Sequence, residues 1–380
     1  MVETGRPWAA IAGGGTAGHV SPGLAVAEEI VRRGAERSDV VWIGSSRGLE
    51  ARLVPDAGFL LTALPGRGIQ RRLTPTNLVS IAGLVTGVVR AVVGFARHRP
   101  SVLVALGGYA SVAGVIAAVV WRVPIVLTEQ NAVPSVANRL ASRFAKACAT
   151  PFPDVDLPNA TWTGNPVRPE IVAVDRAAQH DDACTTLGID AGRRVLLVMG
   201  GSLGARRINH ALFDVLPAWR EREDLAVHHI AGARDHDELA ARVPIDPSDP
   251  LDYRLVRYEG DMASVYAATD LVLCRAGGNS VAELAVVGLP SILVPLPGAP
   301  GDHQTANGRA LADAGAAVLV ADDQLDAARL RAEVESLLDD ADRRTRMAEA
   351  AAAIGRPDAP AAIVDLVEAH ARRPLPGSSR

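Results

Sequence analysis

Two glycine-rich loops, one in each half of the chain, each follow a short apolar run and lead into a helical pattern. The first is IAGGGTAGHVSPGL at residues 11–24, and the second is GGSLGARRIN at 200–209, directly after the run RRVLLVMG. A strand that ends in a glycine loop and continues into a helix opens a doubly wound α/β unit. Two such loops predict two parallel sheets, each covered by helices on both faces.

Short β-like runs alternate with helical patterns on both sides of a proline-rich stretch at 151–168. Since 380 residues exceed what one core usually supports, we predict an N-terminal domain over 1–164 and a C-terminal domain over 165–357. The expected strands are 8–12, 39–44, 101–106, 124–129 and 146–150 before the stretch, and 193–200, 225–232, 270–275, 290–296 and 316–321 after it. The expected N-terminal helices are about 22–33, 48–56, 76–97, 111–121 and 135–145.

Composition excludes several classes of protein. The net charge of −4 and an aromatic content of 4% disfavour nucleic acid as a partner. The three cysteines, Cys148, Cys184 and Cys274, are widely spaced and odd in number, which fits a reducing cytoplasm rather than a disulfide framework. We see no signal-peptide pattern. No run of about 18 uninterrupted apolar residues predicts a transmembrane helix.

One region is strongly biased in charge. Residues 57–128 contain no Asp or Glu, and within them 78–89, LVSIAGLVTGVV, is almost wholly apolar. A basic and apolar surface docks on anionic membranes, but a buried helix flanked by solvated arginines explains the same pattern. The arginines of this region are Arg67, Arg71, Arg72, Arg90, Arg97, Arg99 and Arg122.

The first glycine loop matches the dinucleotide fingerprint G-x-G-x-x-G through Gly13, Gly15 and Gly18. That fingerprint needs an acidic residue at the end of the second strand, whereas Asp39 stands at the beginning of that strand. A nicotinamide-dependent oxidoreductase is therefore disfavoured. His19 follows the loop at a helix opening, where it is either a general base or a residue that caps the helix.

The second half offers loops suited to a nucleotide diphosphate. Ser202, among the glycines of the second loop, and the backbone of 277–280 in CRAGGNSVAEL can donate to phosphates. Glu283 either accepts hydrogen bonds from ribose hydroxyls or forms a capping box with Ser280. The loop PLPGAPGDHQTANG at 295–308 supplies amide and carboxylate groups suited to a sugar.

A metal site is not expected. Asp154 and Asp156 form a D-x-D, which holds a metal and a nucleotide diphosphate in some transferases, but here they lie in the proline-rich boundary. We therefore interpret them as a solvated loop and predict no required metal or other cofactor.

Taken in order, the motifs GGGTAGH, GGY, EQN, GNPVR, GGS-x-GA, CR-x-G, a Glu six residues further on, and DHQ-x-x-N resemble the MurG family of glycosyltransferases. The resemblance runs from about residue 8 to the final helices. It implies a GT-B architecture, in which two Rossmann-like domains face a cleft, and a last helix at about 358–372 that packs back on the first domain. The activity implied is inverting transfer of N-acetylglucosamine from UDP-N-acetylglucosamine to the muramyl 4-hydroxyl of lipid I, forming lipid II in peptidoglycan synthesis.

The resemblance also assigns residues. His19 matches the general base. The donor would be held by Thr16, Ala17, Gly18, Asn131, Arg168, Ser202, Gly277, Gly278, Asn279, Ser280, Glu283 and Gln304. The acceptor would be held by Gly14, Gly15, Gly107, Gly108 and Tyr109. The chain differs from the family pattern at Thr128, Leu203 and 278–280.

The implied location is peripheral, at the cytoplasmic face of the cell membrane, with lipid I, an anionic membrane surface and other cell-wall or division proteins as partners. Other functions remain open at this point. A natural-product glycosyltransferase and a UDP-N-acetylglucosamine 2-epimerase share the fold, and a non-catalytic membrane-docked scaffold belongs to a different class.

Overall fold

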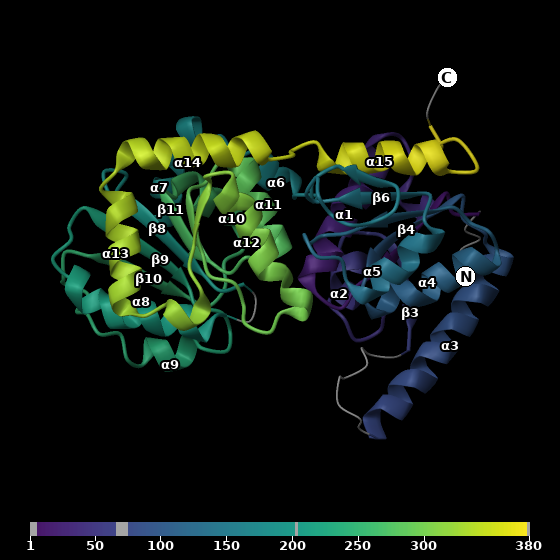
Figure 1. The fold of residues 1–380 in the computed structure, drawn as a ribbon, viewed down its shortest axis with the longest axis horizontal. Coiled ribbons are helices and arrows are strands. Elements are labelled where there is room, and N and C mark those ends of the chain that lie inside the picture. Colours follow the sequence, from purple (N-terminus) through teal and green to yellow (C-terminus); the bar gives the residue numbers. More distant parts are fainter. Residues whose placement is uncertain (1–5, 66–74, 202–203, 378–380) are drawn as a thin grey trace. The chain divides into compact units, whose positions relative to one another are not determined.

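The computed structural model describes residues 6–65, 75–201 and 204–377, with the side chains of 75–81 left out. The chain divides into two compact units (Figure 1). Unit 1 comprises Met1–Arg168 and Arg356–Arg380, and unit 2 comprises Pro169–Gly355. The domain limits expected from the sequence, at 164/165 and 357/358, lie close to these.

The sheet of unit 1 has seven parallel strands in the order β3-β2-β1-β4-β5-β6-β7. The strands are β1 Ala9–Gly13, β2 Val40–Ser45, β3 Leu60–Leu64, β4 Val102–Gly107, β5 Ile125–Thr128, β6 Ala147–Thr150 and β7 Ala160–Trp162. The helices are α1 Ala17–Arg32, α2 Glu50–Asp56, α3 Pro75–Arg97, α4 Tyr109–Val120, α5 Val136–Ala141 and, near the C-terminus, α15 Ala359–His370. Chain order reverses between β1 and β4, so this is the topological switch point of the sheet.

Alternate residues of the central strand face opposite layers. Ala9 and Ile11 pack with α1 and α15, in a core that includes Ile30 and Val364. Ala10 and Ala12 pack on the other face, in a core to which α3 and α4 contribute. Because successive side chains of a strand point to opposite faces, a strand covered on both sides is apolar throughout. This explains why β1 and β4 are fully buried.

Helix α15 belongs to unit 1 although it follows unit 2 in the chain (Figure 1). It packs on α1, where Arg33 bridges to Asp365 at 2.6 Å and Glu368 at 3.0 Å. Beyond the helix, the Trp8 indole donates to the Arg373 carbonyl at 3.0 Å. The last helix thus packs on the first unit, as the family resemblance implies.

Unit 2 has a six-stranded parallel sheet in the order β10-β9-β8-β11-β12-β13, with its switch point between β8 and β11. The strands are β8 Arg194–Met199, β9 Leu225–Ile230, β10 Asp252–Val256, β11 Leu271–Cys274, β12 Ser291–Leu293 and β13 Ala317–Leu319. The helices are α6 Pro169–Val172, α7 Arg176–Leu187, α8 Arg206–Trp219, α9 His236–Ala240, α10 Met262–Ala268, α11 Gly278–Val287, α12 His303–Asp313, α13 Ala327–Leu338 and α14 Ala341–Ile354.

The strands that the sequence analysis missed are β3, β7 and β10, which lie at edges of the two sheets. Their residues are half-buried or exposed, apart from Leu64. An edge strand packs little apolar surface, so it lacks the continuous apolar run that marks β1 or β8.

Two further observations bear on the expectations from composition. Cys148, Cys184 and Cys274 are all free and buried. Among the described residues, none of the helices combines the length and the apolar character needed to cross a bilayer.

Candidate functional site

In unit 1 the loops after β1 and β4 meet at the switch point of the sheet. Gly13 pairs with Gly107 in the last register position of these strands. A Cβ added to Gly108 would lie 3.2 Å from the Gly14 carbonyl oxygen and 3.7 Å from Cε1 of His19. The structure therefore brings Gly108 of the GGY loop close to Gly14 of the first glycine loop and to the ring of His19. Ligands of open α/β sheets bind at this kind of position.

His19 lies in the first turn of α1, which begins at Ala17. The sequence analysis began this helix at Pro22, which is wrong because Pro22 lies inside it. Thr16 is the N-cap residue, and its Oγ1 lies 3.2 Å from Nδ1 of His19. The hydroxyl therefore orients the ring, while Thr16, Ala17 and Gly18 line the start of the helix.

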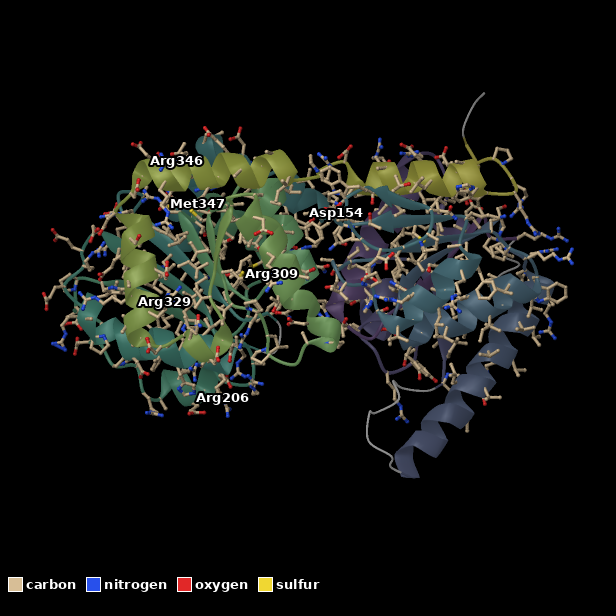
Figure 2. All side chains as sticks on the ribbon, viewed as in Figure 1. Asp154, Arg206, Arg309, Arg329, Arg346 and Met347 are labelled. Atoms are coloured by element: carbon tan, nitrogen blue, oxygen red, sulfur yellow. The ribbon has the colours of Figure 1, made fainter. Side chains whose placement is uncertain are left out.

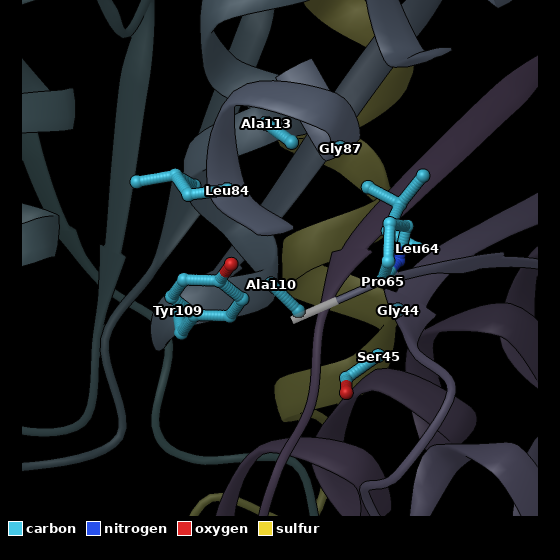
Figure 3. A pocket seen from close by; sticks show the side chains of 9 residues that line it. All are labelled: Gly44, Ser45, Leu64, Pro65, Leu84, Gly87, Tyr109, Ala110 and Ala113. Atoms are coloured by element: carbon cyan, nitrogen blue, oxygen red, sulfur yellow. The ribbon is translucent and has the colours of Figure 1, made fainter. Parts of the chain in front are cut away.

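Tyr109 is the first residue of α4, after Gly108, whose φ of +75° suits glycine. Partial burial raises the pKa of the Tyr109 hydroxyl above its usual range. Its ring borders a small hollow of about 10 Å³ (Figure 3), with Ser45 at the end of β2 and Leu84 of α3 among the other residues that line it. The hollow connects the GGY loop with the apolar helix α3.

The EQN loop is organised by Glu129, a residue that the sequence analysis quoted but did not assign. Glu129 is buried, and its Oε1 accepts from the backbone N–H groups of Gln130 and Asn131, both at 3.0 Å. Its Oε2 accepts from Nδ2 of Asn138 at 2.8 Å. Asn138 in turn lies against Gly107, where an added Cβ would come within 2.8 Å of its Oδ1. The motif thus ties Asn131 to the GGY loop.

In unit 2 the corresponding loop follows β8. Gly204 donates to the Gly201 carbonyl at 2.9 Å, and its φ is +78°. A Cβ at Gly204 would lie 2.3 Å from the Ala231 carbonyl oxygen, so the close approach of this loop to the end of β9 requires glycine. Ser202, which was assigned to the donor diphosphate, lies outside the described residues.

The second donor loop precedes α11. This helix begins at Gly278 with Gly277 as N-cap, and no side chain caps it. The capping box between Ser280 and Glu283 is therefore wrong, since Ser280 stands inside the first turn. Oε2 of Glu283 instead accepts from the Tyr266 hydroxyl at 2.8 Å. The backbone N–H groups of Gly278 and Asn279 lie at the positive end of the helix, where phosphates bind.

Three side chains tie together the loops at this end of the second sheet. Gln304 accepts through Oε1 from the backbone N–H of Leu296 at 2.9 Å, which closes the loop at 296–304. Asn307 is buried and donates to the Ala276 carbonyl at 3.1 Å. Arg275 donates to the carbonyls of Val294 and Pro295 at 3.1 and 3.0 Å. The loops after β11 and β12 are thus held as one surface.

A buried polar network lies behind the glycine loop of unit 2. Asn209 donates to Oδ2 of Asp235 and to the Ala231 carbonyl, both at 3.0 Å. His229 contacts Oδ1 of Asn209 through Nε2 at 3.1 Å and the Tyr253 hydroxyl through Nδ1 at 2.8 Å. Burial lowers the pKa of His229 to about 3, so the ring is neutral. Arg206, labelled in Figure 2, bridges to Asp235 from the exposed side of the network.

The remaining predicted residues are placed as follows. Asn131 and Arg168 belong to unit 1, not to the unit that carries the glycine loop after β8. Asp154 and Asp156 are exposed in an irregular segment, as expected, and Figure 2 labels Asp154. Within 6–65, 75–201 and 204–377, no group of three or more His, Cys, Asp or Glu side chains is arranged to hold a metal ion.

Two parallel-sheet units, each with a glycine loop at its switch point, form the GT-B architecture of many sugar-nucleotide glycosyltransferases, which UDP-N-acetylglucosamine 2-epimerases share. The N-terminal domain model of glycosyltransferase family 28 matches residues 9–150, and the C-terminal domain model of that family matches 195–362. The chain belongs to this family.

Individual relatives of the chain have more specific descriptions than the two family models. A UDP-N-acetylglucosamine--N-acetylmuramyl-(pentapeptide) pyrophosphoryl-undecaprenol N-acetylglucosamine transferase of Desulforudis audaxviator is 40% identical over 94% of this chain and 97% of its own length. A transferase of the same description from Acidothermus cellulolyticus is 42% identical over 96% of this chain and 98% of its own length. The crystal structure of Acinetobacter baumannii MurG matches with a TM-score of 0.75 and 28% identity, covering 95% of this chain and 99% of that one.

Proposed function

We propose that this glycosyltransferase moves N-acetylglucosamine from UDP-N-acetylglucosamine to the 4-hydroxyl of the N-acetylmuramyl residue of lipid I. The observation that carries the proposal is the approach of His19 to the GGY loop at the switch point of unit 1. The near-full-length similarity to transferases named for this reaction supports the choice of substrates.

In the proposed reaction His19 is the general base. The contact of Thr16 with Nδ1 suits a ring whose Nδ1–H donates to the hydroxyl oxygen. Nε2 then accepts the proton of the muramyl 4-hydroxyl as its oxygen attacks the anomeric carbon. The bond from that carbon to the diphosphate breaks, and inversion follows from attack on the face opposite to the leaving UDP.

We assign the donor mainly to unit 2. Glu283, oriented by Tyr266, would accept hydrogen bonds from the ribose hydroxyls. The N-terminal amides of α11 and the glycine loop with Ser202 would bind the diphosphate and stabilise the charge that develops on UDP, and Arg168 would add a guanidinium. Gln304 would contact the sugar. Because amides and a guanidinium supply this stabilisation, the proposed reaction requires no metal or other cofactor.

The test is UDP release from UDP-N-acetylglucosamine with and without a lipid I analogue, with UDP-N-acetylgalactosamine and UDP-glucose as competing donors. Release that depends on the analogue and prefers UDP-N-acetylglucosamine is expected. Conversion of the sugar nucleotide to its 2-epimer without acceptor would instead identify an epimerase. Transfer to neutral aglycones as fast as to the lipid I analogue would identify a natural-product transferase. The absence of any turnover would identify a non-catalytic scaffold.

We also propose that unit 1 docks peripherally on the cytoplasmic face of an anionic membrane, where a polyprenyl-linked acceptor lies. Val85, Val89 and Val93 are spaced by four along α3 and are 57%, 55% and 42% exposed. A second such stripe, outside the region that the sequence analysis singled out, consists of Val136, Leu140 and Phe144. Helix α4 contacts both α3 and α5.

The charges around these stripes favour the same surface. Glu129 is the single acidic residue between 57 and 153, and it is buried. The exposed basic side chains in the described part of this region are Arg90, Arg97, Arg122, Arg139, Arg143 and Lys146. Apolar side chains of such a surface insert at the lipid boundary, and the surrounding basic side chains attract the anionic headgroups.

Sedimentation with phosphatidylglycerol vesicles tests this surface. The double variant Val89→Glu/Val136→Glu should bind several-fold less protein to the vesicles, whereas Val243→Glu, which changes an exposed valine of unit 2, should bind like the wild type. Equal binding of both variants would refute the assignment. Further cell-wall or division proteins remain candidate partners for this unit.

A further inference from the structure

A buried carboxylate lies directly beneath the first glycine loop. Glu50, the first residue of α2, is completely buried. Its Oε2 accepts from the backbone N–H of Gly15 at 2.7 Å, and its Oε1 accepts from the backbone N–H of Ser45 at 2.7 Å. One side chain therefore joins the loop after β1 to the end of β2.

The surrounding backbone leaves room for this carboxylate and for little else. A Cβ added to Gly14, Gly44 or Gly48 would come within 2.2, 2.6 or 2.1 Å of Glu50 side-chain atoms. Glycines from the loop after β1 and from the end of β2 and its following turn thus enclose one acidic group. The conformation of the first loop and the position of Glu50 depend on each other.

Burial of a carboxylate is unfavourable unless donors compensate for the lost hydration. Here two backbone amides do so, and the position of Glu50 at the start of α2 adds the favourable end of the helix dipole. Gly15 is itself exposed, so water could have satisfied its amide at no such cost. A merely structural turn does not need this arrangement, which suggests that the loop must be held in one conformation.

The loop is also held from its other end. The indole Nε1 of Trp42 donates to the Gly13 carbonyl at 2.9 Å in a buried contact. Gly13 and Gly15 are therefore both fixed immediately before Thr16 and His19. Helix α1 begins at the next residue after Thr16, so any shift of the loop moves the imidazole.

We propose that Glu50 is a positioning residue for transfer: it fixes the Gly15 amide and, through it, the backbone from which Thr16 and His19 project. The inference rests on the proposed role of His19. It has a second consequence for the chemistry of the loop. The Gly15 amide is engaged by an anion of the protein, so this loop presents His19 to a hydroxyl group rather than that amide to a phosphate.

The test compares Glu50→Gln with Glu29→Gln in the full-length protein. Glutamine keeps the shape of the side chain but can accept from one of the two amides while presenting its NH2 group to the other. Glu29 is the matched control, because it is also buried in unit 1 but is paired with Arg32 and Arg33, away from the loop.

For Glu50→Gln we expect kcat for transfer to fall about 10- to 100-fold, with the Kd of UDP-N-acetylglucosamine unchanged and faster amide exchange confined to the peptide that covers 13–19. Glu29→Gln should change none of the three, although its melting temperature falls. Wild-type kcat and exchange in Glu50→Gln, or an equal loss of donor affinity, would overturn the proposal.

Two further measurements keep the outcome clear. In the wild-type protein the Gly15 amide proton should exchange slowly and resonate downfield despite the exposure of that residue, and a fast-exchanging amide would overturn the proposal even if the variant fails to fold. His19→Ala is measured in parallel. If His19→Ala is inactive and Glu50→Gln is normal, the positioning role alone fails, whereas full transfer activity of His19→Ala removes the general-base role of His19 on which the inference rests.

Discussion

The two glycine loops have the same place in their sheets but are held in different ways. Each follows the first strand of its unit at the switch point and leads into a helix. The loop of unit 1 is bound to the carboxylate of Glu50, with an imidazole in the following helical turn. The loop of unit 2 is closed by its own backbone and followed by Arg206 and Arg207. Under the proposed function, the first loop serves proton transfer and the second serves a nucleotide anion.

The largest expected effect concerns the loop of unit 1. His19→Ala should lower kcat for transfer roughly 10³-fold, because a general base contributes about 10²–10⁴-fold. The Kd of UDP-N-acetylglucosamine, measured by calorimetry, should stay the same because the donor is assigned mainly to unit 2 and His19 is assigned to the acceptor hydroxyl. Near-full transfer by a folded His19→Ala protein would remove the distinction between the loops.

The second-largest expected effect tests the role of unit 2 in donor binding. Glu283→Gln should weaken UDP-N-acetylglucosamine binding about 10- to 100-fold, since hydrogen bonds to a charged group contribute about 1.5–3 kcal/mol. Tyr266→Phe, which removes only the hydrogen bond to Glu283, should weaken it less than about 10-fold. If Glu283→Gln binds the donor normally, the ribose is held elsewhere.

A smaller effect distinguishes the two units by the pH dependence of their stability. The pKa of His229 is about 3 in the folded protein and about 6.5 when unfolded. The unfolded state thus binds more protons between these values, and the stability of unit 2 falls as pH drops through this window. At pH 4.5 the loss from this group should be about 3 kcal/mol relative to pH 7.

Hydrogen exchange resolves this effect by unit. Peptides of β8 and β9 should lose protection between pH 7 and 4.5 more than peptides of β1 and β4. His229→Gln should reduce the difference, because glutamine does not take up a proton. Equal loss of protection in both units would show that the buried network does not respond to acid.

The sequence predicted the buried strands and missed edge strands, for a physical reason. A strand such as β4 is covered on both faces and is apolar throughout, whereas β3 at the edge is mostly exposed and resembles a loop in sequence. The motif residues could be selected from the sequence because the glycines follow predicted strands directly and His19 follows the first of these glycine loops. The pairing of loops after β1 and β4 follows from the parallel topology.

The supporting residues could not be predicted in the same way. Glu50 is an ordinary helix-start glutamate in the sequence, and its burial depends on Gly14 after β1 and on Gly44 and Gly48 in and after β2. Glu283 looked like half of a capping box until the helix start at Gly278 excluded it. The network of Asn209, His229 and Asp235 joins β9 to α8 and to the segment before α9, so no local spacing reveals it.

The most direct test of the division between the loops is a matched pair of glycine substitutions, Gly15→Ala and Gly201→Ala. Both glycines have positive φ, +93° and +77°, and a Cβ meets nothing within 4 Å at either site. Both substitutions therefore introduce a similar backbone strain of about 1–2 kcal/mol. Titration with UDP measures the consequence. We predict that Gly201→Ala weakens UDP binding by at least tenfold while Gly15→Ala leaves it unchanged and lowers only transfer to the acceptor; equal UDP affinities for the two variants, or the reverse order, would contradict it.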